Sequence, residues 1–216
     1  MPSVALPPSP ATSEEPSVRA RILHQARADF FARSYSAVTM DDLATELGMS
    51  KKTLYLHFTG KDALIREVIL GLGEEIRADA DALIRNRHLN FAEKLRGFTE
   101  GMMQRMQPVT PHTLRDLQRF APALHDLINE VRQKTVPYVF GRFVEEGQIA
   151  GMVRTDLNAA FAVEFYLHAL QGLLQPATLD RLQLAPREVC ARAIELFFGG
   201  LLTPAGRKEH EKLFPR

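Results

Sequence analysis

The stretch GMSKKTLYLHF, residues 48–58, decides the fold because it places a turn, a cap and a short helix in direct succession. Gly48 accepts a left-handed backbone at little cost and therefore ends the helix before it. Ser50 is a favoured N-cap for the helix that follows. Lys51, Lys52 and Thr53 then occupy the first exposed turn of that helix. A lysine pair beside the apolar run LYLHF is either an ordinary solvated face or a surface aimed at a partner.

A second short helix is expected before this turn, in the stretch MDDLATEL at residues 40–47. Thr39 is a good N-cap for it, and two aspartates in its first turn favour the positive end of the helix dipole. Ala44 is small where the two helices must cross. The small core between the helices comes from Leu43, Leu47, Met49 and Leu54. This arrangement predicts a helix-turn-helix, whose second helix presents its N-terminal residues to base edges in the major groove. Lys51 and Lys52 are then placed to contact guanine or nearby phosphates, which we favour over simple solvation.

Further short elements follow one another in order between residues 35 and 64, in YSAVTMDDLATELGMSKKTLYLHFTGKDAL. They are a threonine before the second helix, an Asp-Leu-Ala element at 42–44, a Gly-Met-Ser turn at 48–50, a Leu-Tyr pair at 54–55, a His-Phe pair at 57–58, and a lysine, an acid and a leucine at 61, 62 and 64. With the amphipathic helix and Phe-Phe pair before them, they resemble the DNA-binding domain of the tetracycline-repressor (TetR) family of bacterial regulators. The resemblance covers about residues 17–64. Two positions depart from the family pattern: Lys52 stands where the family commonly has a small residue, and Gly60 replaces the usual serine cap.

The resemblance implies roles for individual side chains. Thr39 and Tyr55 would hold DNA phosphates, with the Tyr55 ring buried and its hydroxyl facing the phosphate. His57 would either contact a phosphate or be an ordinary surface residue, and Lys61 would reach a phosphate from the start of the fourth helix. The predicted DNA-binding residues are Thr39, Ser50, Lys51, Lys52, Thr53, Tyr55, His57 and Lys61. The resemblance also implies repression as the default, and release of DNA when a bound ligand moves the fourth helix.

The chain as a whole is predicted to be all-α, with an N-terminal three-helix helix-turn-helix DNA-binding domain and a C-terminal helical domain for ligand binding and dimerisation. Residues 1–16 hold five prolines and are predicted to be a disordered tail. Residues 17–62 are expected to form the DNA-binding domain, and residues 63–216 the effector-binding and dimerisation domain. Helices are expected at 17–34, 40–47, 50–57, 61–85, 91–106, 111–120, 122–147, 156–175 and 186–202. Pro137 lies inside one of them and is expected to kink it or split it in two.

The last two long helices are apolar around most of their circumference, whereas a helix that packs on one side only should show a polar stripe. The second apolar side of these helices packs either against the same helix pair of a second subunit, forming a four-helix bundle, or against the interior of the same subunit. We favour the homodimer, because reading two half-sites requires two recognition helices about 34 Å apart. The predicted interface residues are Ala160, Val163, Leu167, Leu170, Leu174, Val189, Ala193, Leu196, Phe197 and Gly200.

Apolar residues elsewhere in the C-terminal domain are either ordinary core or the lining of a pocket between helices. The predicted pocket residues are Phe98, Met102, Met106, Leu117, Phe120, Phe140, Phe143, Phe165 and Tyr166, with Arg119, His168 and Gln171 as polar anchors. The methionines favour an adaptable lining. The expected effector is therefore an unidentified small molecule of apolar or aromatic character.

The composition narrows the class of protein. The 216 residues carry a net charge of +1, with 45% hydrophobic and 25% charged residues, as in ordinary globular proteins. A single cysteine fits a reducing cytoplasm, and no stretch is apolar enough to span a membrane. Because no phosphate loop, C-x-x-C, H-E-x-x-H or G-x-S-x-G motif occurs, we predict no enzymatic activity, no cofactor and no metal. Glu164 and His168 are four residues apart, whereas a di-iron bundle uses Glu-x-x-His, in which the two are three residues apart. We therefore do not favour a metal site at this pair.

The sequence therefore predicts a cytoplasmic, homodimeric transcriptional regulator, a ligand-responsive repressor that binds a palindromic operator in double-stranded DNA. Two alternatives remain open. One is an effector-free DNA-binding regulator whose C-terminal domain only dimerises or recruits a partner. The other is an all-helical enzyme that kept the fold.

Overall fold

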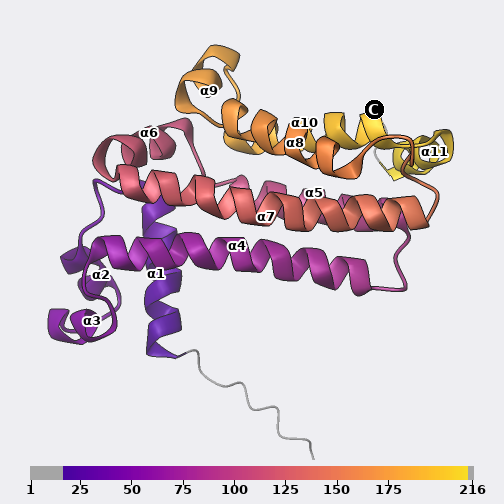
Figure 1. Cartoon of the computed structure of the whole chain (residues 1–216). Coiled ribbons are helices and arrows are strands. Elements are labelled where there is room, and N and C mark those ends of the chain that lie inside the picture. Colours follow the sequence, from indigo (N-terminus) through magenta and orange to yellow (C-terminus); the bar gives the residue numbers. More distant parts are fainter. Residues whose placement is uncertain (1–16, 214–216) are drawn as a thin grey trace, which may run out of the picture.

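The computed structural model describes residues 17–213 and folds them into eleven α-helices, with no strand among them (Figure 1). The helices are α1 (Val18–Arg33), α2 (Met40–Glu46), α3 (Lys51–His57), α4 (Lys61–Arg85), α5 (Phe91–Met106), α6 (Pro111–Phe120), α7 (Pro122–Ile149), α8 (Ala159–Leu173), α9 (Pro176–Leu182), α10 (Pro186–Leu201) and α11 (Pro204–Leu213). The predicted fold class is confirmed. The predicted disordered tail, residues 1–16, lies outside the described residues.

The first three helices begin at hydroxyl caps. Ser17 Oγ accepts a hydrogen bond from the backbone N–H of Ala20 at 3.2 Å. Thr39 and Ser50 do the same for the N–H groups three residues later, at 3.1 Å in both cases. These bonds satisfy N–H groups that have no partner inside the helix. The two caps predicted for the helix-turn-helix are therefore confirmed.

Two short helices, α9 and α11, were not expected from the sequence. Pro176 and Pro204 each start one of these helices, a position where the missing N–H of proline costs nothing. Helix α7 is not split at Pro137 and runs unbroken through it. The neighbouring Val136 and Val139 are buried, so packing of the surrounding turns holds the helix across the proline.

Helix α4 contributes to all three cores of the molecule. Leu64 belongs to the core of the helix-turn-helix, which α1–α4 form together. Ile65 belongs to a second core, which joins α1 and α4 to α6 and α7. Ala80 belongs to the large C-terminal core. At about 1.5 Å per residue, the 25 residues of α4 span roughly 37 Å, so one rigid element connects the DNA-binding end to the rest (Figure 1).

Within residues 17–213, no helix is both long and apolar enough to cross a lipid bilayer. The same residues contain no cluster of three or more His, Cys, Asp or Glu side chains placed to hold a metal ion.

Candidate DNA-binding surface and ligand cavity

The helix-turn-helix rests on side chains that turn inward from α2 and α3. Leu43 and Ala44 of α2 are buried with Leu54 of α3 and with Phe58, in the core that α1–α4 share. Gly48, in the turn between the helices, has a φ of +63°, the left-handed conformation predicted for it. This packing fixes α3 against α2 and leaves the opposite face of α3 in solvent.

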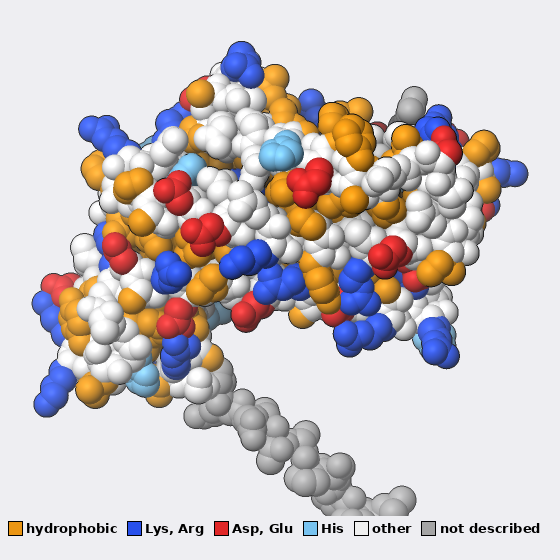
Figure 2. All heavy atoms as spheres, in the orientation of Figure 1, with side chains coloured by type: hydrophobic (Ala, Val, Ile, Leu, Met, Phe, Trp, Pro, Cys, Tyr) orange, Lys and Arg blue, Asp and Glu red, His pale blue; other side chains and the backbone are white. Residues whose placement is uncertain are grey.

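The exposed face of α3 combines positive charge with apolar surface. Lys51, Lys52 and His57 are exposed, and Leu56 is 77% exposed. Figure 2 shows lysine and arginine side chains projecting from this end of the molecule. Lysine can contact phosphates and base edges, and an apolar side chain can contact the methyl group of thymine. Leu56 was not among the predicted DNA-binding residues. Leu56 could have been identified from the sequence, because it is an apolar residue between two predicted DNA-binding residues, Tyr55 and His57.

The two lysines at the start of α3 differ in their partners. Lys51 Nζ forms an ion pair of 2.5 Å with Asp41 Oδ2, and both side chains are more than half exposed. An exposed pair of this kind contributes about 1 kcal/mol or less, so a DNA phosphate can replace Asp41. Lys52 has no hydrogen bond or ion pair with any residue from 17 to 213. Lys52 can therefore meet DNA without giving up a partner.

The structure corrects the expected burial of Tyr55 and gives Lys61 partners within the chain. Tyr55 is 50% exposed, because Leu54 takes the inner face of the short helix α3. Lys61 Nζ donates to the carbonyl oxygens of Tyr35 and Val38, at 3.0 Å each, and lies 4.1 Å from the centre of the Tyr35 ring. A phosphate would have to share the Lys61 ammonium with these groups.

The loop between α1 and α2, residues 34–39, is held by α6 as well as by α4. The carboxylate of Asp116 accepts from Ser36 N at 2.7 Å and from Ser36 Oγ at 2.5 Å. His112 Nδ1 lies 3.0 Å from the hydroxyl oxygen of Ser34. From α4, Lys61 binds two carbonyl groups of the same loop. The position of the helix-turn-helix is therefore set by two helices that belong mainly to the other domain.

Tyr35 completes the attachment of this loop to α4. Its hydroxyl donates to the carboxylate of Asp62. Burial, together with the neighbouring carboxylates of Asp62 and Asp116, raises the pKa of Tyr35 to about 12. The tyrosine therefore remains protonated at physiological pH and keeps donating.

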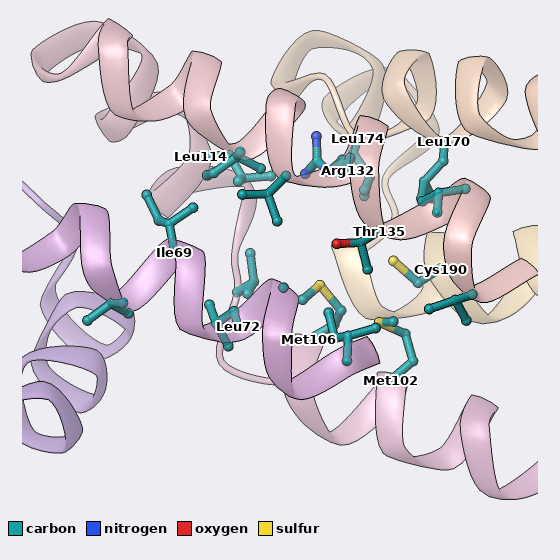
Figure 3. A pocket seen from close by; sticks show the side chains of 18 of the residues that line it. Ile69, Leu72, Met102, Met106, Leu114, Arg132, Thr135, Leu170, Leu174 and Cys190 are labelled. Carbon is teal, nitrogen blue, oxygen red and sulfur yellow. The ribbon is translucent and has the colours of Figure 1, made fainter. Parts of the chain in front are cut away.

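A cavity of about 150 Å³ lies in the middle of the molecule (Figure 3). Side chains of α1, α4, α5, α6, α7, α8 and α10 line it. The lining is apolar except for Thr113, Arg132, Thr135, Tyr166 and Cys190. Because α1 and α4 form part of the wall, whatever fills the cavity touches helices that carry the DNA-binding surface.

Half of the predicted pocket residues line this cavity. The lining includes Phe98, Met102, Met106, Leu117, Phe140 and Tyr166. It does not include Arg119, Phe120, Phe143, Phe165, His168 or Gln171. Phe165 and His168 point outward from α8, Phe120 is exposed at the end of α6, and Phe143 packs in the C-terminal core. Helix α8 is apolar on more than one face, so the sequence pattern did not distinguish its inward face from its outward one.

Arg132 lines the cavity and was not among the predicted pocket residues. It is the only charged side chain in the lining that the described residues form, and its Nη1 donates to Asn129 Oδ1 at 3.1 Å. Burial lowers the pKa of its guanidinium, and Cys190 offsets this effect only in part. Burial also raises the pKa of the Cys190 thiol to about 11, so the thiol is neutral at physiological pH. In the sequence, Arg132 could have been identified as an arginine that lies between buried positions of a long helix.

An apolar outer face covers α8 and α10 on the side away from the cavity. It consists of Leu157, Phe161, Phe165 and Leu196, of which Phe165 is 65% and Leu196 78% exposed. Figure 2 shows hydrophobic side chains gathered over these two helices. Three predicted interface residues are exposed here, namely Ala160, Leu196 and Gly200. The other seven are buried in the subunit's own core, which corrects their assignment: Val163, Leu167, Leu170, Leu174, Val189, Ala193 and Phe197.

Known proteins share both the motif and the fold. Residues 22–68 match the model of the bacterial regulatory proteins of the tetR family. The HTH-type transcriptional regulator UidR of Escherichia coli (strain K12) is 24% identical over 193 residues, covering 88% of this chain and 96% of UidR. The uncharacterized HTH-type transcriptional regulator YvaF of Bacillus subtilis (strain 168) is 23% identical over 163 residues, covering 76% and 85%.

Solved structures show the same fold along most of the chain. The fatty acid degradation regulator FadR from Bacillus halodurans superposes with a TM-score of 0.63 at 16% identity, covering 88% of this chain and 98% of FadR. GusR of Salmonella enterica superposes with a TM-score of 0.59 at 20% identity, covering 88% and 98%. Residues 22–68, which hold the helix-turn-helix, therefore form a DNA-binding domain of the type found in the tetR family of bacterial regulatory proteins.

Proposed function

We propose that the protein is a ligand-responsive repressor, which binds a near-palindromic operator as a homodimer and releases it when a small molecule fills the cavity. The observation that carries the proposal is the composition of the cavity wall. Helices α1 and α4 supply part of that wall, and the same helices form the core on which α2 and α3 rest. A ligand would therefore act on the DNA-binding domain by direct contact. The proposal places the protein in the cytoplasm, where operator DNA is found.

The exposed face of α3 is the proposed DNA-reading surface. Lys52 and Leu56 are exposed and without polar partners in the described chain, so we assign them to base edges and thymine methyl groups. Tyr55 and His57 are exposed on the same helix and are assigned to phosphates. We assign Lys51 to a base edge or to a phosphate, which it would contact once its ion pair with Asp41 is broken. Thr39, Ser50 and Thr53 lie at the helix caps, where a phosphate would meet free N–H groups.

The outer face of α8 and α10 is the proposed dimer interface. Exposed phenylalanines and leucines that gather on one surface mark an interaction site. A second copy of the same helix pair would bury them in a four-helix bundle with two-fold symmetry. That symmetry matches a palindromic operator, whose half-sites lie about 34 Å apart.

The size of the cavity explains how binding would release DNA. Small-molecule pockets usually measure about 300–1,000 Å³, so a cavity of about 150 Å³ is small for most ligands. A cavity of this volume holds a molecule the size of benzene, so a ring that carries a further group must push the walls apart, and α4 is one of them. The ligand would then favour a state in which α4 is displaced and the two recognition helices no longer fit their half-sites.

The test uses fluorescence-labelled DNA from the region next to the protein's own gene. Wild-type protein should bind it with a strong dependence on salt concentration. Lys52→Ala should weaken binding, whereas Lys134→Ala, which removes an exposed lysine of α7, should not. Equal binding by wild type and Lys52→Ala across all salt concentrations would disprove the role given to α3. Sedimentation velocity on the same samples tests the homodimer.

A further inference from the structure

We propose that the cavity selects small apolar monocarboxylates, whose carboxylate pairs with Arg132. The inference rests on the proposed function and names the chemical class of its ligand. It begins from an unbalanced charge. No carboxylate within residues 17–213 forms an ion pair with Arg132, and the oxygen of Asn129 is its one hydrogen-bond partner there. A guanidinium in apolar surroundings is costly unless an opposite charge compensates it.

The groups around Arg132 do not supply that charge. Cys190 interacts with it electrostatically, but burial keeps the Cys190 thiol protonated. Tyr166, which also interacts with Cys190, is buried, and its pKa lies well above the usual value. Both groups are therefore neutral at physiological pH. A negative charge at this place has to come from the ligand.

Two hydroxyl groups in the lining are available as further donors. Tyr166 is only 3% exposed, and its hydroxyl has no hydrogen-bond partner in the described chain. Thr135 lies one helical turn after Arg132, and its Oγ1 accepts from Arg77 Nη1 at 2.9 Å, which leaves the hydroxyl hydrogen free. Figure 3 shows the Thr135 oxygen pointing into the cavity. A cation and two hydroxyl donors without an acceptor match a carboxylate, which accepts through two oxygens.

The remaining lining sets the size and polarity of the rest of the ligand. A dry apolar cavity of about 150 Å³ holds a molecule the size of benzene, and this cavity has about that volume. Met102 and Met106 can adapt to a slightly larger body. A phosphate would bring a charge of about −1.5 to −2, more than one guanidinium neutralises. The ligand class is therefore a single-ring or short branched-chain carboxylic acid.

The experiment compares benzoate with benzyl alcohol, which has a similar shape but no charge. Binding to the full chain is measured by calorimetry and by the shift in melting temperature. Benzoate should stabilise the wild-type protein, and Arg132→Met should weaken benzoate binding at least tenfold. Benzyl alcohol should bind the wild type and Arg132→Met equally. Methionine keeps the apolar volume, and removal of a partly buried charge that has no ion-pair partner should not prevent folding. Arg119→Met, on the exposed side of α6, is the matched control and should leave benzoate binding unchanged.

The outcomes separate this inference from the proposed function. If benzyl alcohol stabilises the protein and releases the operator as well as benzoate does, the response to a ligand stands and selection of acids is wrong. If Arg132→Met binds benzoate as the wild type does, Arg132 is not the partner and the inference falls. If neither compound binds, the inference also falls, and operator binding in the same samples shows whether the DNA-binding role survives.

Discussion

Gly73 sets how closely α4 approaches α7 beside the cavity, and replacing it by alanine tests that role. An added Cβ would lie 2.5 Å from Cγ1 of Val131 and 3.3 Å from Oγ1 of Thr135. Carbon atoms in contact are ordinarily about 3.5–4.0 Å apart, so the helices must separate by roughly 1 Å or Val131 must turn. Valine in a helix has one strongly preferred rotamer. We therefore expect α4 to move away from α7.

The expected change in stability follows from two opposing effects. Extra volume in a packed contact destabilises a protein by about 1–3 kcal/mol. Replacing glycine by alanine inside a helix stabilises it by about 1 kcal/mol. Gly71→Ala is the matched control, because it lies in the same helix and an added Cβ there would meet nothing within 4 Å. The free energy of unfolding of Gly73→Ala should lie below that of Gly71→Ala by about 1–3 kcal/mol.

Urea unfolding followed by far-ultraviolet circular dichroism measures this difference. It is done at one protein concentration, because association changes apparent stability. The displaced α4 should also weaken operator binding by Gly73→Ala about 5- to 30-fold, or roughly 1–2 kcal/mol, with no change in Gly71→Ala. Equal stability of the two variants would refute the close contact. A loss of stability with unchanged operator affinity would refute the link between α4 and DNA binding.

Further predictions concern the DNA surface, the loop, the outer face and the cavity. Lys52→Ala should lower the salt slope of operator binding by about one. Lys51→Ala should lower it less, because Asp41 already neutralises part of the Lys51 charge. Anisotropy titrations at several salt concentrations measure both slopes. Replacing Asp116 by alanine removes two charge-assisted hydrogen bonds to the loop and should cost about 3–6 kcal/mol of unfolding free energy in urea. Phe165→Glu should give a monomer in sedimentation with unchanged helix content, because its ring is exposed. Burial raises the pKa of Cys190 in the folded protein to about 11. Its contribution to the free energy of unfolding is therefore complete below about pH 9 and is lost as the pH rises towards 11. Between these pH values, the free energy of unfolding in urea should fall less for Cys190→Ala than for the wild type.

The helix-turn-helix was predictable because its signals are local. Thr39, Gly48 and Ser50 act through backbone groups within three residues, and the structure places each where its chemistry required. The faces of the C-terminal helices were less predictable, because α8 is apolar nearly all round. Its periodicity showed that two sides must be covered. Whether Phe165 or Tyr166 turns toward the cavity depends on how α8 packs against distant helices.

The cavity itself was the least predictable feature. Arg132 comes from α7, Tyr166 from α8 and Cys190 from α10, and only tertiary packing brings them to one wall. Short helices were missed for a related reason. Prolines 176 and 204 mark either the end of one helix or the start of the next, and local sequence does not separate these cases.

The arrangement of α6 explains how a change in the cavity can reach the DNA-binding domain without passing through α4 alone. Thr113, Leu114 and Leu117 of this ten-residue helix line the cavity, while Asp116 on the same helix holds Ser36 in the loop before α2. Hydrogen bonds to a charged group contribute about 1.5–3 kcal/mol each, so the pair of bonds to Asp116 amounts to roughly 3–6 kcal/mol. Coupling between a ligand site and a second site is typically about 1–3 kcal/mol. The hydrogen bonds to Asp116 therefore contribute more free energy than the expected coupling between the two sites. The loop should follow α6 when that helix moves, rather than detach from it. Lys61 of α4 binds the same loop. A ligand that separates α4 from α6 should therefore distort the base of the helix-turn-helix, and we expect DNA binding to weaken through strain in the loop as well as through movement of α4.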